Sequence, residues 1–130
     1  MSNMFILLMM VFMHILDDYV LQAPCLCDLK QKGFWEKNAP QALYKDDYKI
    51  ALLMHAFSWS FMIMLPIAFN LNFNVGMNFA IILGVNTIFH AYIDDLKANQ
   101  YRLNLWTDQA YHIFQIISTY TLFELGVFNA

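Results

Sequence analysis

The chain has 130 residues, a length typical of one domain. Hydrophobic residues make up 60% of it and charged residues 13%, against roughly 45–50% and about 25% in soluble globular proteins. A water-soluble globule would lack the polar side chains to cover its surface, so the composition favours a membrane protein. The formal net charge of −3, with no long basic cluster, argues against a nucleic-acid-binding protein.

The first predicted membrane span covers about residues 4–22. Met1 to Leu16 contain no charged side chain, and apolar residues resume after Asp17 and Asp18. About 20 residues are needed to cross the hydrocarbon core of a bilayer. The segment is as apolar as a signal peptide, but it lacks a positively charged start and a small-residue cleavage site. We therefore expect a retained membrane helix.

Residues 23–48 form the only long polar segment, in which acidic and basic side chains alternate with aromatic ones. This mixture is typical of a chain lying along a membrane interface. We expect an interfacial, partly helical loop, which also offers a docking surface for a protein partner or a second copy of the chain. The spacing of Cys25 and Cys27 only weakly indicates a disulfide or a zinc site.

A long apolar stretch follows, because no Asp, Glu, Lys or Arg occurs between Ile50 and Ile93. It is long enough for two spans, and turn-forming residues at 70–76 divide it into a helical hairpin. A short polar link then leads to another apolar segment. The sequence therefore predicts three further spans, at about 49–69, 75–96 and 105–127.

The basic residues predict the orientation, since all seven lie in or beside the two loops on one side of the predicted membrane. The positive-inside rule makes that side cytoplasmic. The predicted fold is all-α: residues 1–130 form one domain, an integral membrane four-helix bundle with both termini on the non-cytoplasmic side. Cys25 and Cys27 then face the reducing side, where disulfides are rare.

Histidines and aspartates gather at one depth of this predicted bundle, near the cytoplasmic ends of all four spans. Three histidine–aspartate pairs have a spacing of four residues, so each pair projects from one face of its helix. A charged residue costs about 2.5–3.5 kcal/mol at the bilayer centre, so these carboxylates must face a cation, water or one another. The candidate site residues are His14, Asp18, His55, His90, Asp94, Asp108 and His112.

The order of these residues resembles a family of small bacterial and phage membrane proteins that is known only as a domain of unknown function. The shared motifs are H-x-x-x-D-Y-x-x-Q from His14 to Gln22, the lone His55, H-x-x-x-D-x-x-K from His90 to Lys97, and D-Q-x-x-H from Asp108 to His112. The resemblance covers nearly the whole chain. It implies a four-helix fold in the inner membrane of a bacterium or a phage-infected cell, and it carries no established activity.

Three interpretations of the polar site stay open. Imidazole and carboxylate groups on facing helices are typical ligands for zinc, iron or manganese. The same groups could instead form a hydrogen-bonded network that fixes helix packing in a structural or regulatory subunit. They could also form a proton or ion relay, although the outer halves of the spans offer few polar residues to continue it.

Our preferred hypothesis is a divalent-metal-dependent hydrolase that acts on a lipid or lipid-linked ester at the cytoplasmic leaflet. A metal site just beneath the headgroups would lie where such ester bonds lie, with membrane lipids as its partners. Asp108 is expected to be a metal ligand or the general base, and His55 a ligand or the acid for the leaving group. The expected metal ligands are His14, Asp18, His90, Asp94 and His112. Lys30, Lys97 and Arg102 could attract an anionic substrate.

Overall fold

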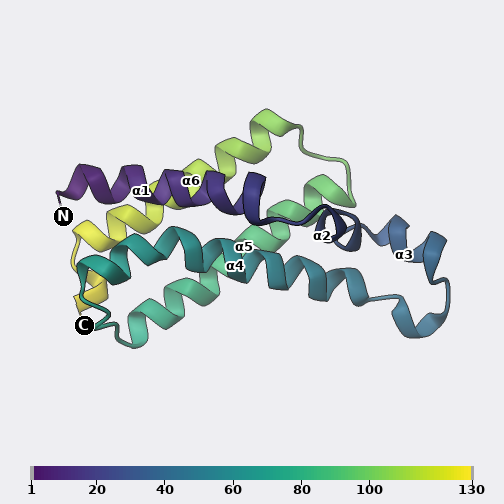
Figure 1. Ribbon diagram of the computed structural model, residues 1–130, viewed down its shortest axis with the longest axis horizontal. Coiled ribbons are helices and arrows are strands. Elements are labelled where there is room, and N and C mark those ends of the chain that lie inside the picture. The colour runs from purple at the N-terminus through teal and green to yellow at the C-terminus, as the bar shows by residue number, and fades with distance from the viewer. Residues whose placement is uncertain (1, 130) are drawn as a thin grey trace.

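A computed structural model describes residues 2–129, which form helices joined by turns, with no strand among them. The expectation of an all-α protein is confirmed. The four long helices are α1 (Asn3–Leu16), α4 (Asp47–Asn70), α5 (Met77–Ala98) and α6 (Leu105–Glu124) (Figure 1). The short segments are a π-helical turn (Asp17–Leu21), α2 (Pro24–Leu29), α3 (Lys32–Asn38) and two 3-10 turns (Ala42–Tyr44 and Val127–Asn129).

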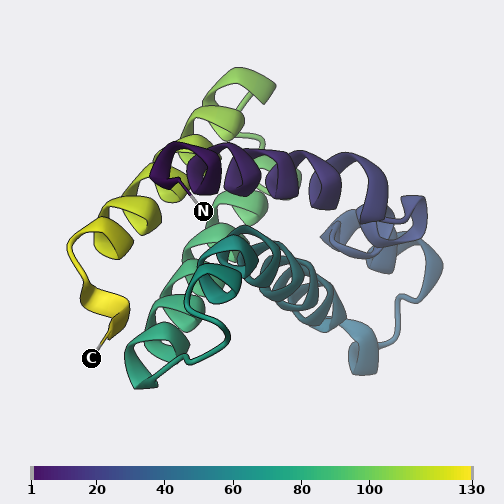
Figure 2. The ribbon, with the colours of Figure 1, turned by 60° about the vertical axis from the view of Figure 1, so that its left-hand side comes forward.

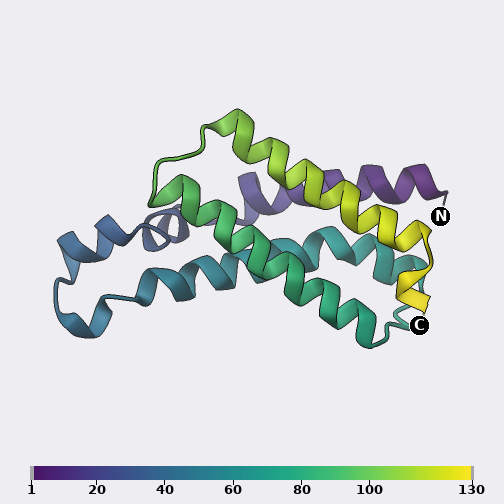
Figure 3. The same cartoon turned by 180° about the vertical axis from the view of Figure 1, so that it is seen from behind.

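The four long helices pack against one another, with α1 and α5 each contacting both α4 and α6. Figures 2 and 3 show α4 crossing α5, and α6 lying beside α5 on the far side from α4. The start of α1, the end of α6 and the turn between α4 and α5 lie together at one end of the molecule, which we call the terminal end (Figure 1). There the Asn3 amide donates a hydrogen bond to Glu124 at 2.9 Å, and the Asn78 amide donates one to the Val127 carbonyl at 2.9 Å. The opposite end, which carries α2, α3 and the link between α5 and α6, is called the loop end.

Three helical stretches of the described residues are long and apolar enough to cross a membrane: Asn3–Leu21, Ala42–Asn70 and Met77–Ala98. Their composition agrees with a membrane location. Helix α6 is not among the three, and its sequence includes Asp108, His112 and Gln115, whose side chains are buried. The outer faces of the helices carry large apolar side chains that are more than half exposed, as lipid contact would require; examples are Leu8, Phe12, Phe57, Ile88 and Phe114.

Local sequence explains how α5 and α6 begin and therefore where their polar residues lie. Asn72 and Phe73 adopt positive φ angles of 52° and 58° in the turn that reverses the chain before α5, within the stretch rich in turn formers. A capping box starts α6, because the Asn104 side chain accepts from the Thr107 N–H at 2.9 Å and the Thr107 hydroxyl accepts from the Asn104 N–H at 3.1 Å. This cap places Asp108 in the first turn of α6.

The core has two chemically different halves. Towards the terminal end, a cluster of apolar side chains joins α1, α4, α5 and α6; it consists of Ile6, Met10, Trp59, Ile63, Met64, Ile67, Ala68, Phe79, Ile116 and Phe128. Towards the loop end, the buried side chains are mostly histidine and aspartate. We refer to the first half as the apolar core.

The loop between the first two long helices is tied to the end of α5 by one asparagine. The Asn99 side chain accepts from the Lys32 N–H at 2.7 Å and donates to the Lys30 carbonyl at 3.1 Å. These bonds hold Lys30 against α5, beside the buried aspartates. Cys25 and Cys27, on α2, are exposed free thiols.

Candidate metal centre

All four histidines lie in one buried layer with four aspartates. The exposed fraction of each histidine is 2% or less, and Asp17, Asp94 and Asp108 are 6% exposed or less. Asp18 is slightly more open, with a side chain 12% exposed. We call this set the His/Asp cluster; its members are His14, Asp17, Asp18, His55, His90, Asp94, Asp108 and His112.

The atoms of the cluster are spaced as metal ligands are. Nε2 of His55 and Nε2 of His90 lie 3.3 Å apart, and Oδ1 of Asp18 lies 3.5 Å from Nε2 of His55. Asp94 contributes Oδ2 at 3.6 Å from Nε2 of His55 and Oδ1 at 3.7 Å from Nε2 of His90. Two nitrogens bound tetrahedrally to one zinc ion at about 2.0–2.1 Å would be separated by roughly 3.3–3.4 Å. The nitrogens of His55 and His90 therefore have the spacing of two ligands of one tetrahedral ion, and carboxylate oxygens of Asp18 and Asp94 lie close to them.

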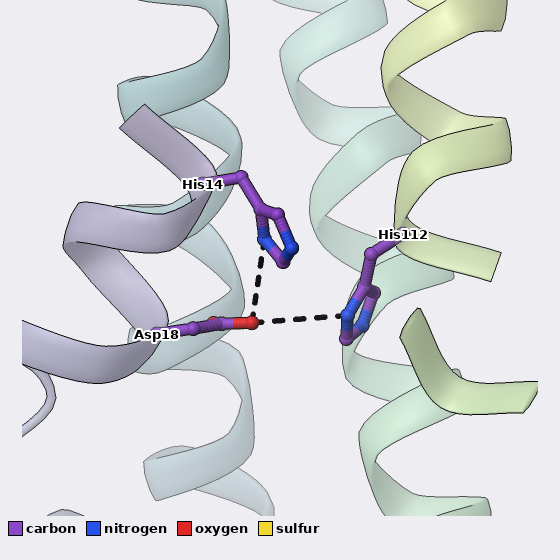
Figure 4. A group of neighbouring side chains, drawn as sticks. All are labelled: His14, Asp18 and His112. Carbon is purple, nitrogen blue, oxygen red and sulfur yellow. Dashed lines mark ion pairs between the residues drawn. The ribbon is translucent and has the colours of Figure 1, made fainter. Parts of the chain in front are cut away.

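Asp18 lies at the centre of the layer. Figure 4 shows it between His14 and His112, with Oδ2 at 3.3 Å from Nδ1 of His14 and 3.8 Å from Nδ1 of His112. Three overlapping triads have their ligand atoms within 4.8 Å of one another: His14–Asp18–His112, Asp18–His55–His90 and His90–Asp94–His112. Six of the seven predicted ligands belong to these triads. Asp108 does not.

His14 differs from the other histidines because both of its ring nitrogens have hydrogen-bond partners. The indole N–H of Trp59 donates to Nδ1 of His14 at 2.8 Å, and an indole nitrogen can only donate. Nε2 of neutral His14 then carries the proton, and it lies 3.1 Å from Oε1 of Gln109. His14 has no lone pair free for a metal ion unless one of these bonds breaks.

Two other histidines have ring nitrogens with no hydrogen-bond partner among the described residues. These buried atoms are Nδ1 of His90 and both nitrogens of His112, and Oδ1 of Asp108 is in the same condition. Leaving a buried polar atom unpaired costs about 1–3 kcal/mol. The rings of His90 and His112 stack with centroids 4.4 Å apart, and Nε2 of His112 lies 3.9 Å from Oδ1 of Asp108. A cation bound by His112 would offset part of this cost.

Two lysines approach the cluster from the loop end. Nζ of Lys30 lies 2.7 Å from Oδ2 of Asp94, and Nζ of Lys97 lies 2.6 Å from Oδ2 of Asp108. With neutral histidines, the four carboxylates and the two ammonium groups leave a formal charge of −2 (four negative, two positive). One divalent cation would balance that charge.

The cluster opens towards the loop end through a cavity of about 210 Å³. Its lining runs from His55 and His112 out to the exposed Tyr19 and Leu105. A second cavity, of about 350 Å³, shares Gln22, Lys30, Asp94 and Lys97 with the first. Catalytic metal sites keep an open coordination position, whereas structural sites are closed. The cavity gives the cluster such an open side.

Asp17 is the cluster residue that spacing from His14 did not single out, because the four-residue rule favoured Asp18. The Ser58 hydroxyl donates to Oδ1 of Asp17 at 2.7 Å, and Oδ2 of Asp17 lies 3.7 Å from Nδ1 of His55. The wide turn that follows α1, closed by a bond of 2.9 Å from the Gln22 N–H to the Asp17 carbonyl, brings both aspartates inward. Asp17 thus lies behind His55, on the side away from Nε2.

Asp94 and Asp95 separate as the four-residue spacing from His90 predicted. Asp94 is in the cluster. Asp95 points away from it and accepts hydrogen bonds from the side chains of Asn99 at 2.8 Å and Gln100 at 2.9 Å.

A second buried polar group lies between the His/Asp cluster and the apolar core. The Asn86 amide donates to the Thr119 hydroxyl at 2.9 Å, and the Gln115 amide donates to the Asn86 carbonyl at 2.7 Å. Gln115 did not stand out in the sequence, although it lies three residues after His112 and so on nearly the same helix face. Beyond these residues the apolar core occupies the space between the helices.

The chain was compared with protein-family models, curated proteins and solved structures, and none of the three comparisons gives a match. The function is therefore argued from the site alone.

Proposed function

We propose that this protein is an integral membrane metalloprotein that binds one divalent ion in the His/Asp cluster. The spacing of the His55, His90, Asp18 and Asp94 ligand atoms, 3.3–3.7 Å from one to the next, is the observation that carries the proposal. In this proposal all four long helices cross the membrane as a bundle, and the cluster lies near the cytoplasmic face, which the basic residues at the loop end support by the positive-inside rule. Both termini then lie on the opposite side.

The ligands in this proposal are His55, His90, Asp18 and Asp94, with His112 as a fifth donor. Mixed nitrogen and oxygen ligands suit zinc, iron or manganese. Asp17 lies behind His55, with Oδ2 3.7 Å from Nδ1, where a carboxylate can orient a metal-binding histidine. His14, fixed by Trp59, supports the ring of ligands and does not bind the ion.

The reaction that this site suits best is hydrolysis of a lipid or lipid-linked ester. A divalent ion lowers the pKa of water and polarises an ester or phosphate oxygen. Asp108 is the general base in this scheme: its Oδ1 is unpaired and lies 3.9 Å from Nε2 of His112, while its Oδ2 is held by Lys97. The cavity at the loop end admits the substrate.

Metal analysis tests the first part of the proposal. Protein purified in detergent without chelators, and supplied with zinc, iron and manganese, should retain one equivalent of metal per chain. His90→Ala and Asp94→Asn should lose it. Asp95→Asn is the matched control, because Asp95 lies next in the chain but outside the cluster, and it should retain the ion. Metal-free wild-type protein under these conditions would contradict the proposal.

The hydrolase assignment needs a separate measurement. Asp108→Asn should keep its metal and lose about 10²- to 10⁴-fold in lipid ester turnover, the usual contribution of a general base. Mass spectrometry of lipids incubated with the metal-loaded protein would detect the products. If the wild-type protein binds metal and no lipid is cleaved, the site is not hydrolytic.

The buried Asn86, Gln115 and Thr119 side chains favour one alternative, a proton or ion relay, because they extend the polar path beyond the histidines. The apolar core then interrupts the path before it reaches the terminal end, and for this reason we prefer the hydrolase. Proton flux into liposomes that is abolished by His90→Ala would instead support the relay.

A further inference from the structure

We propose that the mouth of the cavity is a binding site for a phosphate or phosphate ester, and that it forms only when the metal ion is bound. This inference rests on the metal site proposed above. It assigns Lys30 and Lys97 as the residues that bind the anion, and it gives the substrate a chemical class.

The two lysines make the same arrangement with different aspartates. Asp94 gives Oδ2 to Lys30 and turns Oδ1 towards the imidazoles of His90 and His112. Asp108 gives Oδ2 to Lys97 and keeps Oδ1 near His112. Oδ2 of Asp94 also lies 3.6 Å from Nε2 of His55. In each pair the lysine holds one carboxylate oxygen at the mouth, and the other oxygen faces the histidines.

A metal ion would act on the first pair directly, because Asp94 is a proposed ligand, and on the second pair through its charge, because Asp108 lies beside His112. Lys30 and the ion both attract the Asp94 carboxylate. An ion bound to Asp94 would therefore weaken the ion pair between Asp94 and Lys30. Without the ion, the cluster has a formal charge of −2 and repels an anion. With a divalent ion it is neutral, and the ammonium groups are free to pair with an incoming oxyanion.

The lysines are placed to meet such an anion. Both line the cavity above the ligands and also the second cavity that continues from it. Lys97 has a side chain 41% exposed, whereas that of Lys30 is only 11% exposed. An oxyanion between them would lie at the open side of the ion.

Calorimetric titration with inorganic phosphate tests the inference in detergent-purified protein. Phosphate should bind the metal-loaded protein at least tenfold more tightly than the metal-free protein. Lys30→Met and Lys97→Met, loaded with metal, should each weaken phosphate binding at least tenfold. Lys30→Arg should preserve it, and one equivalent of metal retained by each Met variant would exclude a folding defect. Lys37→Met, in the same loop but outside both cavities, is the matched control and should bind as wild type does.

The outcomes separate this inference from the proposal beneath it. If the wild-type protein binds no metal, the metalloprotein proposal fails. If it binds metal, but phosphate binds equally with and without the ion or equally to Lys30→Met, only the anion site is wrong. Nanodiscs identify the source of the phosphate: competition by phosphatidylglycerol, but not by phosphatidylcholine, would assign the site to an anionic headgroup. If inorganic phosphate binds equally well in nanodiscs of either lipid, the site binds a soluble phosphate compound.

Discussion

Trp59 determines the chemistry of one histidine while packing against another. Its N–H fixes the Nδ1 of His14 as an acceptor, and its ring stacks on His90 with centroids 4.2 Å apart. A fully buried tryptophan at this point holds two imidazoles in different roles, although all four histidines share one layer.

This difference leads to a prediction for two glutamine substitutions. His14→Gln should retain the metal, because a glutamine oxygen can still accept from Trp59 and no ligand is lost. His55→Gln should lose it, since Nε2 of His55 is at the centre of the ligand spacing. Metal content per chain, measured on both purified variants, checks the contrast. Equal loss in both variants would show that His14 is a ligand after all.

Asp17 leads to a prediction of smaller size. Asp17→Asn removes the negative charge behind His55 without removing a ligand, so metal affinity should fall about 10- to 100-fold, as it does when outer partners of metal-binding histidines are changed. A competition titration against a coloured chelator would give the affinity. Asp28→Asn, a change of the same kind on exposed α2, should leave it unchanged.

Spacing along the chain predicted the inward faces of Asp18 and Asp94, because residues four apart share a helix face. It could not predict the ion pairs of Lys30 with Asp94 or of Lys97 with Asp108. The first joins residues 64 positions apart and the second crosses the link between two helices. It also missed Asp17, because the π-helical turn departs from the regular helical period.

At the scale of the elements, α5 and α6 are joined by buried polar contacts below the His/Asp cluster as well as within it. Asn86 on α5 bonds to both Thr119 and Gln115 on α6. Helix α6 therefore turns its polar residues inward and leaves Phe114 and Ile117 exposed. The mean hydropathy of such a helix underestimates how apolar its lipid-facing surface is, because the average includes histidine and glutamine side chains that are buried inside the protein.

Asn86→Ala should destabilise the protein by about 1–2 kcal/mol, because interhelical polar bonds in membrane proteins contribute about 0.6 kcal/mol each on average and up to about 1.7. Thr87→Ala is the neighbouring control: the Thr87 hydroxyl bonds to the Leu83 carbonyl within its own helix, so its loss should cost little. Unfolding by a denaturing detergent, followed by helical circular dichroism, would measure both. Equal stabilities of the two variants would show that the Asn86 contacts do not join α5 to α6.

Hydrophobic runs and turn formers predicted the all-α class and the order of the long helices. For example, the apolar run begins after Lys49 and ends where the turn formers begin at Asn70. The helix α4 covers nearly the same residues, Asp47–Asn70. The sequence did not predict how the helices cross, since in the terminal half of the molecule the lipid-facing and core-facing positions are both apolar.

For the whole molecule, metal binding should appear as stability that depends on pH. An ion that binds only the folded chain at one hundred times its dissociation constant adds about 2.7 kcal/mol. Protonated imidazole cannot bind a metal, so this gain should be present at pH 7.5 and decrease as the solution is made acidic. Thermal unfolding with added metal or chelator at pH 7.5 and 5.5 checks this. Asp18→Asn should show no metal-dependent shift at either pH.

The apolar core has a consequence for how the ion enters and leaves. It fills the terminal end, while the two cavities beside the cluster lie at the loop end, so we expect ions and water to exchange through the loop end. In sealed vesicles, a chelator that cannot cross the bilayer should strip only those molecules whose mouth faces outward. The amount of metal that the chelator does not remove would then equal the amount of protein whose mouth faces the vesicle interior. If the protein were open at both ends, the chelator would remove all of the metal.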